Sequence, residues 1–251
     1  MMRVAVISDT HGNLFALDAV LADIDATGPF DEVIMAGDFA FGGPRPAECI
    51  ERIRERGYRA VRGNTDEFIV EVATGGARPA TGATEAQRHG PPQVAIDRWV
   101  AERLTPAQMD YLASLPLAVT VPGDGGAALT VVHATPWSSH DTVLPDAPDD
   151  LARRALDAAG TAALAYGHIH VQYERRLDGR LIAAVGSVGL PFDGDPRAAY
   201  AVFTSTADGW SVAFRRVAYD VEAAIAATLQ SGVPNAEGFA ATLRAARPGG
   251  R

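Results

Sequence analysis

Cysteine is almost absent from this chain, which has a single one, Cys49, among its 251 residues. One cysteine cannot form a disulfide within the chain, and it cannot supply the thiolate sets of zinc fingers. Cys49 lies in the segment Pro46-Ala47-Glu48-Cys49-Ile50, whose pattern is that of the apolar face of a helix. We therefore expect a buried, inert thiol.

Basic residues are also scarce, with 22 Lys and Arg against 31 Asp and Glu and a net charge of -9. Binding to nucleic-acid phosphates needs clustered basic side chains, so the composition disfavours general nucleic-acid binding and a nuclease function. A small phosphate-bearing substrate remains compatible with this charge, because bound metal cations can supply local positive charge.

Long apolar runs are missing, since none approaches the roughly 20 residues that span a membrane. A predicted strand begins almost at the N-terminus, without the charged leader and apolar core of a secretion signal. We expect a cytoplasmic protein with no membrane partner. The 47% hydrophobic and 21% charged residues are typical of a globular protein, and the length predicts a single domain over residues 1–251.

Strands and helices alternate in the first part of the chain. Apolar strands are predicted over 3–7, 32–36 and 58–62, and helices follow them around 13–26, around 45–56 and from about Asp66. This alternation is typical of a sheet with helices packed on its faces.

Residues 74–114 differ from this pattern and predict a small helical insertion rather than a domain of its own. A Gly- and Pro-rich loop at 74–92 precedes a helix around 93–103, and Thr105-Pro106-Ala107-Gln108 has the form of a helix capping box. At the other end of the chain, one or two amphipathic helices are predicted at about 220–246, followed by a frayed Pro-Gly-Gly-Arg tail.

Hairpins dominate the region between these helical parts. The predicted strand pairs, each separated by a turn rich in Gly or Asp, are 117–121 with 127–132, 171–177 with 180–185, and 199–205 with 211–217. The predicted fold class is α/β, a four-layer αββα sandwich of two mixed sheets flanked by helices. We expect the first sheet to be partly parallel and the second mostly antiparallel.

Metal-ligand residues follow four of these predicted strands and a fifth apolar run, Ala162-Ala163-Leu164-Ala165. The segments are Asp9-Thr10-His11, Gly37-Asp38, Gly63-Asn64-Thr65-Asp66, Val132-His133 and Gly167-His168-Ile169-His170. In α/β sheets, binding sites collect at the carboxyl ends of strands, so these segments should converge on one pocket.

The spacing within the segments indicates shared ions. Residues i and i+2 of an extended segment point the same way, so Asp9 and His11 could bind one ion, and the same holds for His168 and His170. The two oxygens of Asp38 could bridge two cations. The seven candidate ligands are Asp9, His11, Asp38, Asn64, His133, His168 and His170.

Jointly these motifs carry a family resemblance. Ser8-Asp9-Thr10-His11-Gly12-Asn13, Gly37-Asp38, Gly63-Asn64-x-Asp66, His133 and Gly167-His168-x-His170 resemble the motifs of calcineurin-like metallophosphoesterases, and they cover roughly residues 3–190. Within that superfamily, the chain resembles the compact prokaryotic phosphodiesterases and the group related to diadenosine tetraphosphatases.

The resemblance implies a role for each ligand. Asp9, His11 and His170 would hold a first metal, Asn64, His133 and His168 would hold a second, and Asp38 would bridge the two. The ions would be divalent or mixed-valence Mn, Fe, Zn or Ni, which suit a His-rich set better than magnesium does. A metal-activated hydroxide would attack phosphorus, and the ions would offset the charge on its oxygens.

One position departs from the family pattern, which usually reads Gly-Asn-His-Asp where this chain has Thr65. A threonine hydroxyl cannot act as a general acid near neutral pH, so the proton donor for the leaving group is left open. Besides Asp38 and Asn64, we take His140 and Asp66 as catalytic candidates, with surface exposure and helix capping as their respective alternatives. His89 is a weaker candidate than His140.

Three further residues have two interpretations each. Asn13 could contact phosphate, but helix capping is favoured; Trp137 could stack on an aromatic group, but ordinary packing is favoured. Arg62 could face phosphate or solvent.

The predicted function is a dinuclear metal-dependent phosphoester hydrolase, and more specifically a phosphodiesterase acting on a small phosphoester. Hydrolysis of dinucleoside polyphosphates and protein phosphatase activity are the alternatives among enzymes. A metal-binding scaffold on the same fold, as in the retromer subunit that shares it, is the non-enzyme alternative, although all seven ligands are present here. Homo-oligomerisation is left open.

Overall fold

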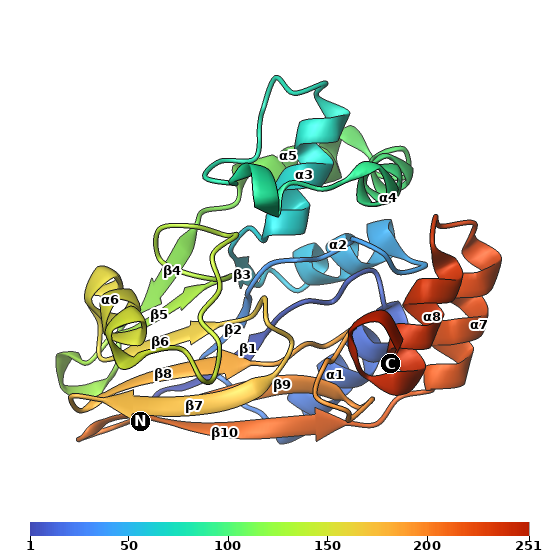
Figure 1. Ribbon diagram of the computed structural model, residues 1–251. Coiled ribbons are helices and arrows are strands. Elements are labelled where there is room, and N and C mark those ends of the chain that lie inside the picture. Colours follow the sequence, from blue (N-terminus) through green and yellow to red (C-terminus); the bar gives the residue numbers. More distant parts are fainter. Residues whose placement is uncertain (251) are drawn as a thin grey trace.

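The first sheet contains both ends of the sheet-forming part of the chain. In the computed structural model, which describes residues 1–250, its strand order is β10-β9-β1-β2-β3 (Figure 1). The strands are β1 (Arg3–Ile7), β2 (Glu32–Met35), β3 (Arg59–Ala60), β9 (Ala198–Thr206) and β10 (Gly209–Val217). β1, β2 and β3 run parallel, while β9 pairs antiparallel with both β1 and β10.

The second sheet has the order β4-β5-β6-β8-β7. Its strands are β4 (Ala118–Val121), β5 (Leu129–Val132), β6 (Ala163–Tyr166), β7 (Gln172–Leu177) and β8 (Arg180–Val185). The prediction of a mostly antiparallel sheet is wrong, because the β5–β6 and β6–β8 pairings are parallel. The cause is helix α6 (Asp149–Ala159), which the sequence analysis did not predict and which crosses over between β5 and β6.

Four layers result, as predicted. Val4 and Val6 of β1 point into the core between the sheets, whereas Ala5 and Ile7 point to the helices outside the first sheet, as the two-residue period of a strand requires. Helices α1 (Leu14–Thr27) and α2 (Pro46–Glu55) cover that outer face. α6 covers the outer face of the second sheet.

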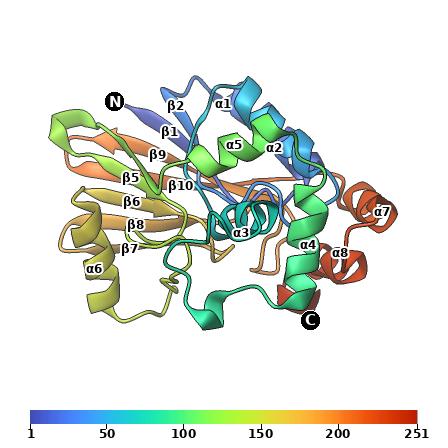
Figure 2. The same cartoon turned by 90° about the horizontal axis from the view of Figure 1, so that it is seen from above.

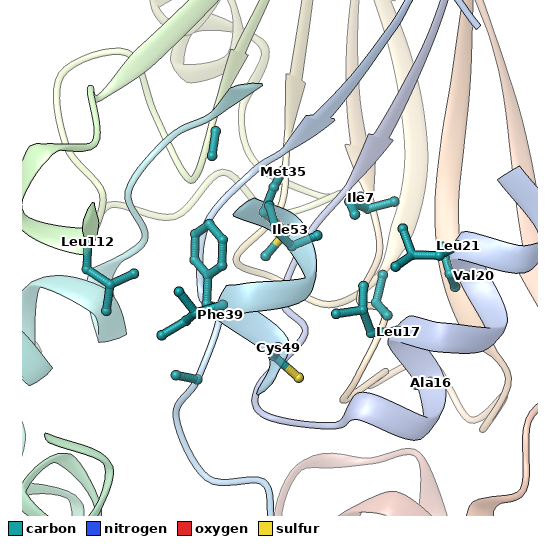
Figure 3. Packing of buried hydrophobic residues seen from close by; sticks show 14 of the residues in the cluster. Ile7, Ala16, Leu17, Val20, Leu21, Met35, Phe39, Cys49, Ile53 and Leu112 are labelled. Carbon is teal, nitrogen blue, oxygen red and sulfur yellow. The ribbon is translucent and has the colours of Figure 1, made fainter. Parts of the chain in front are cut away.

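Cys49 belongs to the core between the first sheet and its helices. Figure 3 shows its side chain on α2 among apolar side chains that include Leu17 of α1 and Ile53 of α2. Burial raises the pKa of the Cys49 thiol well above its usual value.

The predicted helical insertion contains α4 (Pro91–Ala101) and α5 (Pro106–Ser114), which lie beside α3 (Asn64–Ala73) above the sheets (Figures 1 and 2). The predicted capping box is confirmed, since the Thr105 hydroxyl accepts from the backbone N–H of Gln108 at 3.2 Å. The loop before α4 includes a short 3-10 helix, Glu85–Gln87. Another such turn, Asp124–Gly126, joins β4 to β5.

Two C-terminal helices, α7 (Val221–Ser231) and α8 (Ala236–Ala245), confirm the prediction for this region. They form a satellite apolar cluster that packs against Phe15 of α1 and Leu190 of the loop after β8. The predicted frayed tail begins as a 3-10 turn, Pro248–Gly250, and its last residue, Arg251, lies outside the described residues. Among the described helices, none combines the length and the apolar character that crossing a membrane requires.

Candidate metal centre

The seven predicted ligands, called the donor cluster below, converge at the carboxyl ends of five strands. They follow β1, β2, β3, β5 and β6 directly or within a few residues. Side chains from both sheets meet there, since the His133 Nε2, after β5, lies 3.5 Å from the Asp38 Oδ1, after β2. The five strand ends therefore bring their side chains together at one place.

The backbone at the cluster is not extended. The residues of the cluster that have positive φ are Asp9 (55°), His11 (48°), Asp38 (59°), His168 (65°) and His170 (56°). The reasoning from extended i and i+2 neighbours is therefore wrong. Asp9 and His11 do meet, with 3.8 Å between the Asp9 Oδ1 and the His11 Nε2, whereas His168 and His170 face different partners. Left-handed backbone is uncommon outside glycine, and Asp and His are among the residues that tolerate it.

The first half of the cluster comprises Asp9, His11 and His170. The Asp9 Oδ1 lies 3.2 Å from the His170 Nε2 and 3.8 Å from the His11 Nε2. The two Nε2 atoms are themselves 3.2 Å apart. Asp9 is fully buried, and in the described part of the chain its Oδ1 has no hydrogen-bond partner. Such an orphaned buried carboxylate oxygen is what a bound cation would satisfy.

The second half comprises Asn64, His133 and His168. The Asn64 Oδ1 lies 2.9 Å from the His133 Nε2 and 3.1 Å from the His168 Nδ1. Those two ring nitrogens are 3.2 Å apart. Three donor atoms from three different strand ends therefore face one another within hydrogen-bond distance.

Asp38 lies between the halves. Its Oδ2 is 3.6 Å from the His11 Nε2, and its Oδ1 is 3.5 Å from the His133 Nε2. The Oδ1 also accepts the backbone N–H of Thr65 at 3.0 Å, at the start of α3. One carboxylate thus faces both halves, one oxygen to each.

Backbone carbonyls hold three of the imidazoles by their Nδ1 atoms. The His11 Nδ1 donates to the Phe41 carbonyl at 2.9 Å, the His133 Nδ1 donates to the Ala36 carbonyl at 2.8 Å, and the His170 Nδ1 donates to the Leu190 carbonyl. A carbonyl only accepts, so in the neutral rings each Nε2 keeps a free lone pair. This is the way proteins orient metal-binding histidines.

The electrostatics keep the acidic members of the cluster ionised. Burial alone would raise the pKa of Asp9, but the neighbouring His170 and His11 hold it well below its usual range. Burial opposes the ionisation of Asp38 too, yet His133 and His11 lower its pKa. Both carboxylates are therefore anionic at neutral pH and ready to bind cations.

The imidazoles differ among themselves. Burial alone would lower the pKa of His11 and of His133, but the buried Asp9 and Asp38 raise both. Burial together with His133 lowers the pKa of His168 to about 4. His168 is therefore neutral across the physiological range, while His11 and His133 lose their protons at a higher pH than a free imidazole does.

Two glycines allow the segments to approach. A Cβ on Gly63 would overlap the Oδ1 and backbone nitrogen of Asp38, and a Cβ on Gly167 would overlap the Ser8 hydroxyl and the Asp9 Oδ2. Side chains at either position would displace a carboxylate of the cluster.

Asp66 does not face the cluster. Its Oδ2 accepts the backbone N–H groups of Asp38 and Gly63 at 2.9 and 2.8 Å, and its Oδ1 accepts that of Phe39 at 3.0 Å. Burial and the charge of Asp38 raise the pKa of Asp66 to about 6. Its carboxylate joins the start of α3 to the loop that carries Asp38, so it positions the bridging carboxylate.

The two remaining histidines also lie apart from the cluster. The buried His140 places its Nε2 3.0 Å from the Glu67 Oε2, and the His89 Nδ1 lies 2.7 Å from the Asp97 Oδ2. Both rings pack against Phe68 of α3, with centroid distances of 5.1 and 4.1 Å. Sequence reasoning missed both acidic partners, because spacing along the chain gives no sign of a contact between α3 or α4 and these loops.

The residues with two interpretations are placed as follows. The Asn13 Oδ1 caps α1 by accepting from the Ala16 N–H at 3.2 Å. The Trp137 Nε1 donates to the Asp141 Oδ2 at 2.6 Å. The Arg62 Nε lies 2.6 Å from the Glu67 Oε1.

Oxygen and imidazole donors in two groups, joined by a carboxylate, fit two transition-metal ions. Asp9, His11 and His170 would hold the first ion. Asn64, His133 and His168 would hold the second, and Asp38 would be shared. The two-sheet sandwich and this donor set together define the class of metallophosphoesterases.

Comparison with known proteins gives the family. The family model of the calcineurin-like phosphoesterase superfamily domain matches residues 2–208, and the chain belongs to this superfamily. A metallophosphoesterase from Sphaerobacter thermophilus has a crystal structure that is 30% identical in sequence, with a TM-score of 0.76 over 98% of this chain and 99% of that one.

Two further relatives are similar over almost their whole lengths. A hypothetical protein from Pyrococcus horikoshii has the same fold, with 20% identity and a TM-score of 0.80 over the whole of both chains. An uncharacterized protein from Methanocaldococcus jannaschii is 27% identical over an alignment of 248 positions that covers 92% of this chain and 93% of that protein.

Proposed function

We propose that this protein is a phosphodiesterase that uses two transition-metal ions. The placement of Asp38 carries the proposal, because one buried carboxylate presents an oxygen to His11 and the other to His133. Two ions at such a carboxylate lower the pKa of a bound water and neutralise charge on phosphate oxygens. Membership in the superfamily supports phosphoester hydrolysis in general.

The chain's own residues have distinct tasks in this proposal. The donor cluster binds the ions, and the carbonyls of Phe41, Ala36 and Leu190 orient three of its rings. Asp66 holds the backbone of Asp38 in place. The Thr65 Oγ1 is buried and has no hydrogen-bond partner within residues 1–250, and its hydroxyl cannot serve as an acid near neutral pH.

The charges around the cluster favour a diester over a monoester. Arginine is the residue that most often neutralises phosphate oxygens. Among the described residues, no arginine forms an ion pair with Asp9 or Asp38, and Arg62, which precedes Gly63 in the sequence, is paired with Glu67. A diester carries one negative charge where a monoester carries up to two, so it needs less compensation.

The test is hydrolysis of an aryl phosphodiester and of the matching aryl monoester by protein supplied with manganese. We expect turnover of the diester, faster than that of the monoester, and its loss in Asp38→Asn. Asp97→Asn is the matched control, because Asp97 is an equally buried aspartate that pairs with His89 outside the cluster.

Other results would point to the alternatives. If the protein prefers the monoester or a dinucleoside polyphosphate, that compound replaces the diester as the proposed substrate class. Turnover of a phosphopeptide would indicate a protein phosphatase. Absence of all turnover in protein that binds two ions would support the scaffold. The choice among Mn, Fe, Zn and Ni, the cytoplasmic location and the oligomeric state stay predictions.

A further inference from the structure

A cavity of about 260 Å³ adjoins the first half of the donor cluster. Four segments that are distant in the sequence contribute to it. The loops after β2 and β8 contribute Phe41, Leu190 and Phe192, while α4 contributes Ile96 and α8 contributes Phe239 and Thr242. Figure 2 shows α4 and α8 on the same side of the molecule, near the C-terminus.

The cavity shares walls with the metal-binding histidines. Phe41 and Leu190 are the residues whose carbonyls hold His11 and His170. The Phe192 ring stacks on the His170 ring, with centroids 4.2 Å apart and planes 16° apart. The Phe192 ring therefore lies between the cavity and the His170 ring of the cluster. A group joined to a phosphorus atom at the cluster could reach the cavity.

The lining is suited to an uncharged group. None of its described residues is charged, and the aromatic rings of Phe41, Phe192 and Phe239 provide most of the large side chains. The Thr242 hydroxyl donates to the Gly238 carbonyl one helical turn earlier, so its hydrogen is already engaged. A flat apolar group would gain contacts here, and a charged one would lose its hydration without a partner.

The size of the cavity limits its occupant. Sites for whole drug-sized ligands start at about 300 Å³, so a cavity of about 260 Å³ accepts one part of a substrate. We propose that the cavity binds one aryl-type substituent of the phosphodiester substrate, with the phosphorus at the donor cluster. This inference rests on the function proposed above and specifies its substrate class.

Seven of the twelve residues that line the cavity lie beyond the superfamily match, which ends at residue 208. Among them are Phe239 and Thr242 of α8. The metal-binding loops and the segments that choose the substituent are thus separate parts of the sequence. The apolar cluster that fixes α7 and α8 to Leu190 holds the two parts together.

The experiment measures binding without chemistry. Methylphenylphosphinate and dimethylphosphinate are both monoanions without an ester bond, and they differ by one phenyl ring. Titration calorimetry on the manganese-loaded protein should show at least about tenfold tighter binding of the phenyl compound, as the burial of a ring would give. Equal affinity for the two compounds would overturn the inference.

Filling the cavity provides the second arm. Thr242→Phe should abolish the preference for the phenyl compound, and Ile96→Phe should do so from the opposite wall if the first variant does not fold. Leu229→Phe is the matched control, since it places the same ring on α7, where Leu229 is 44% exposed and does not line the cavity. Retention of the preference in a folded filled variant would also overturn the inference.

Failure of this inference differs from failure of the proposed function. If the wild-type protein hydrolyses phosphodiesters but binds the two phosphinates equally, the proposed function stands and the inference about the cavity fails. If the wild-type protein hydrolyses no phosphoester, the proposed function is wrong, whatever its affinities for the two phosphinates.

Discussion

The backbone N–H of Asp38 donates a 2.9 Å hydrogen bond to the Oδ2 of Asp66, and the two residues belong to different strand ends of the first sheet. Asp38 is the shared ligand of the proposed centre. Within residues 1–250, the Asp66 side chain forms no hydrogen bond with any other member of the donor cluster. The position of the bridging carboxylate therefore depends on a residue that does not touch a metal.

Replacing Asp66 with asparagine should weaken metal binding by about 10–100-fold, the usual effect of removing a group that orients a ligand. The amide has one acceptor oxygen, so it cannot accept all three backbone N–H groups that the carboxylate accepts. Titration of the metal-free protein with manganese measures the change. Asp97→Asn serves as the control, and equal losses in the two variants would contradict a positioning role for Asp66.

Gly63 and Gly90 offer a matched pair, because each is the residue before a helix and each has a negative φ. Gly63→Ala should displace Asp38 and abolish binding of at least one ion, since the new methyl would overlap the Asp38 carboxylate. Gly90→Ala should bind metal normally, because its nearest neighbour, the Gln93 Oε1, would lie 3.4 Å away. Metal content after dialysis, measured by mass spectrometry, distinguishes them. Two ions retained by Gly63→Ala would refute the expected displacement.

Metal affinity should rise between about pH 6 and 8. Burial alone lowers the pKa of His11 and His133, but the adjacent carboxylates raise both above the usual value of about 6.5. Protonated rings cannot bind metal, so loading must release their protons. Calorimetry in buffers of different ionisation enthalpy counts the protons released, and pH-independent affinity would contradict the expectation.

The same two histidines set the pH dependence of stability without metal. A folded-state pKa above the unfolded value gives stability that is present below about pH 6.5 and is lost as the pH rises through the folded pKa. Melting temperatures of chelator-treated protein should therefore fall from pH 6.5 to 8, while those of manganese-loaded protein should rise. Parallel curves for the two forms would show that the histidines do not carry this effect.

The thiol of Cys49 should react with Ellman's reagent at least about a hundredfold more slowly in the native protein than in denaturant. Burial raises its pKa, so the reactive thiolate is scarce, and its side chain lies within the core of Figure 3. An exposed cysteine, Ser114→Cys in a Cys49→Ser background, provides the fast control. Rapid modification of native Cys49 would show that α2 opens readily.

The sequence predicted more of the centre than of its scaffold. A polar donor residue that directly follows an apolar run marks the end of a strand. This is why the seven residues could be placed together. The missed helix α6 did carry signals: Asp149 and Asp150 lie in its first turn, and Gly160 ends it in left-handed conformation. Without that helix there was no crossover element between β5 and β6, and the second sheet was predicted to be mostly antiparallel.

Other features could not be predicted from spacing. The left-handed backbone at Asp9 and His11 depends on contacts between loops, such as the His11 N–H with the Asp38 carbonyl at 3.1 Å. The three backbone partners of Asp66 come from two segments. The apolar cavity combines an insertion with the last helix, and each alone has only the pattern of an ordinary amphipathic helix.

The left-handed backbone of the five ligands has a consequence for selection. Each such residue costs on the order of 1 kcal/mol against a right-handed or extended alternative. Random variants screened for heat resistance alone would therefore gain by replacing these ligands with glycine, or by relaxing the turns that hold them. Directed evolution of this protein needs a screen for activity in every round, because the same substitutions would raise the stability and remove the metal ligands.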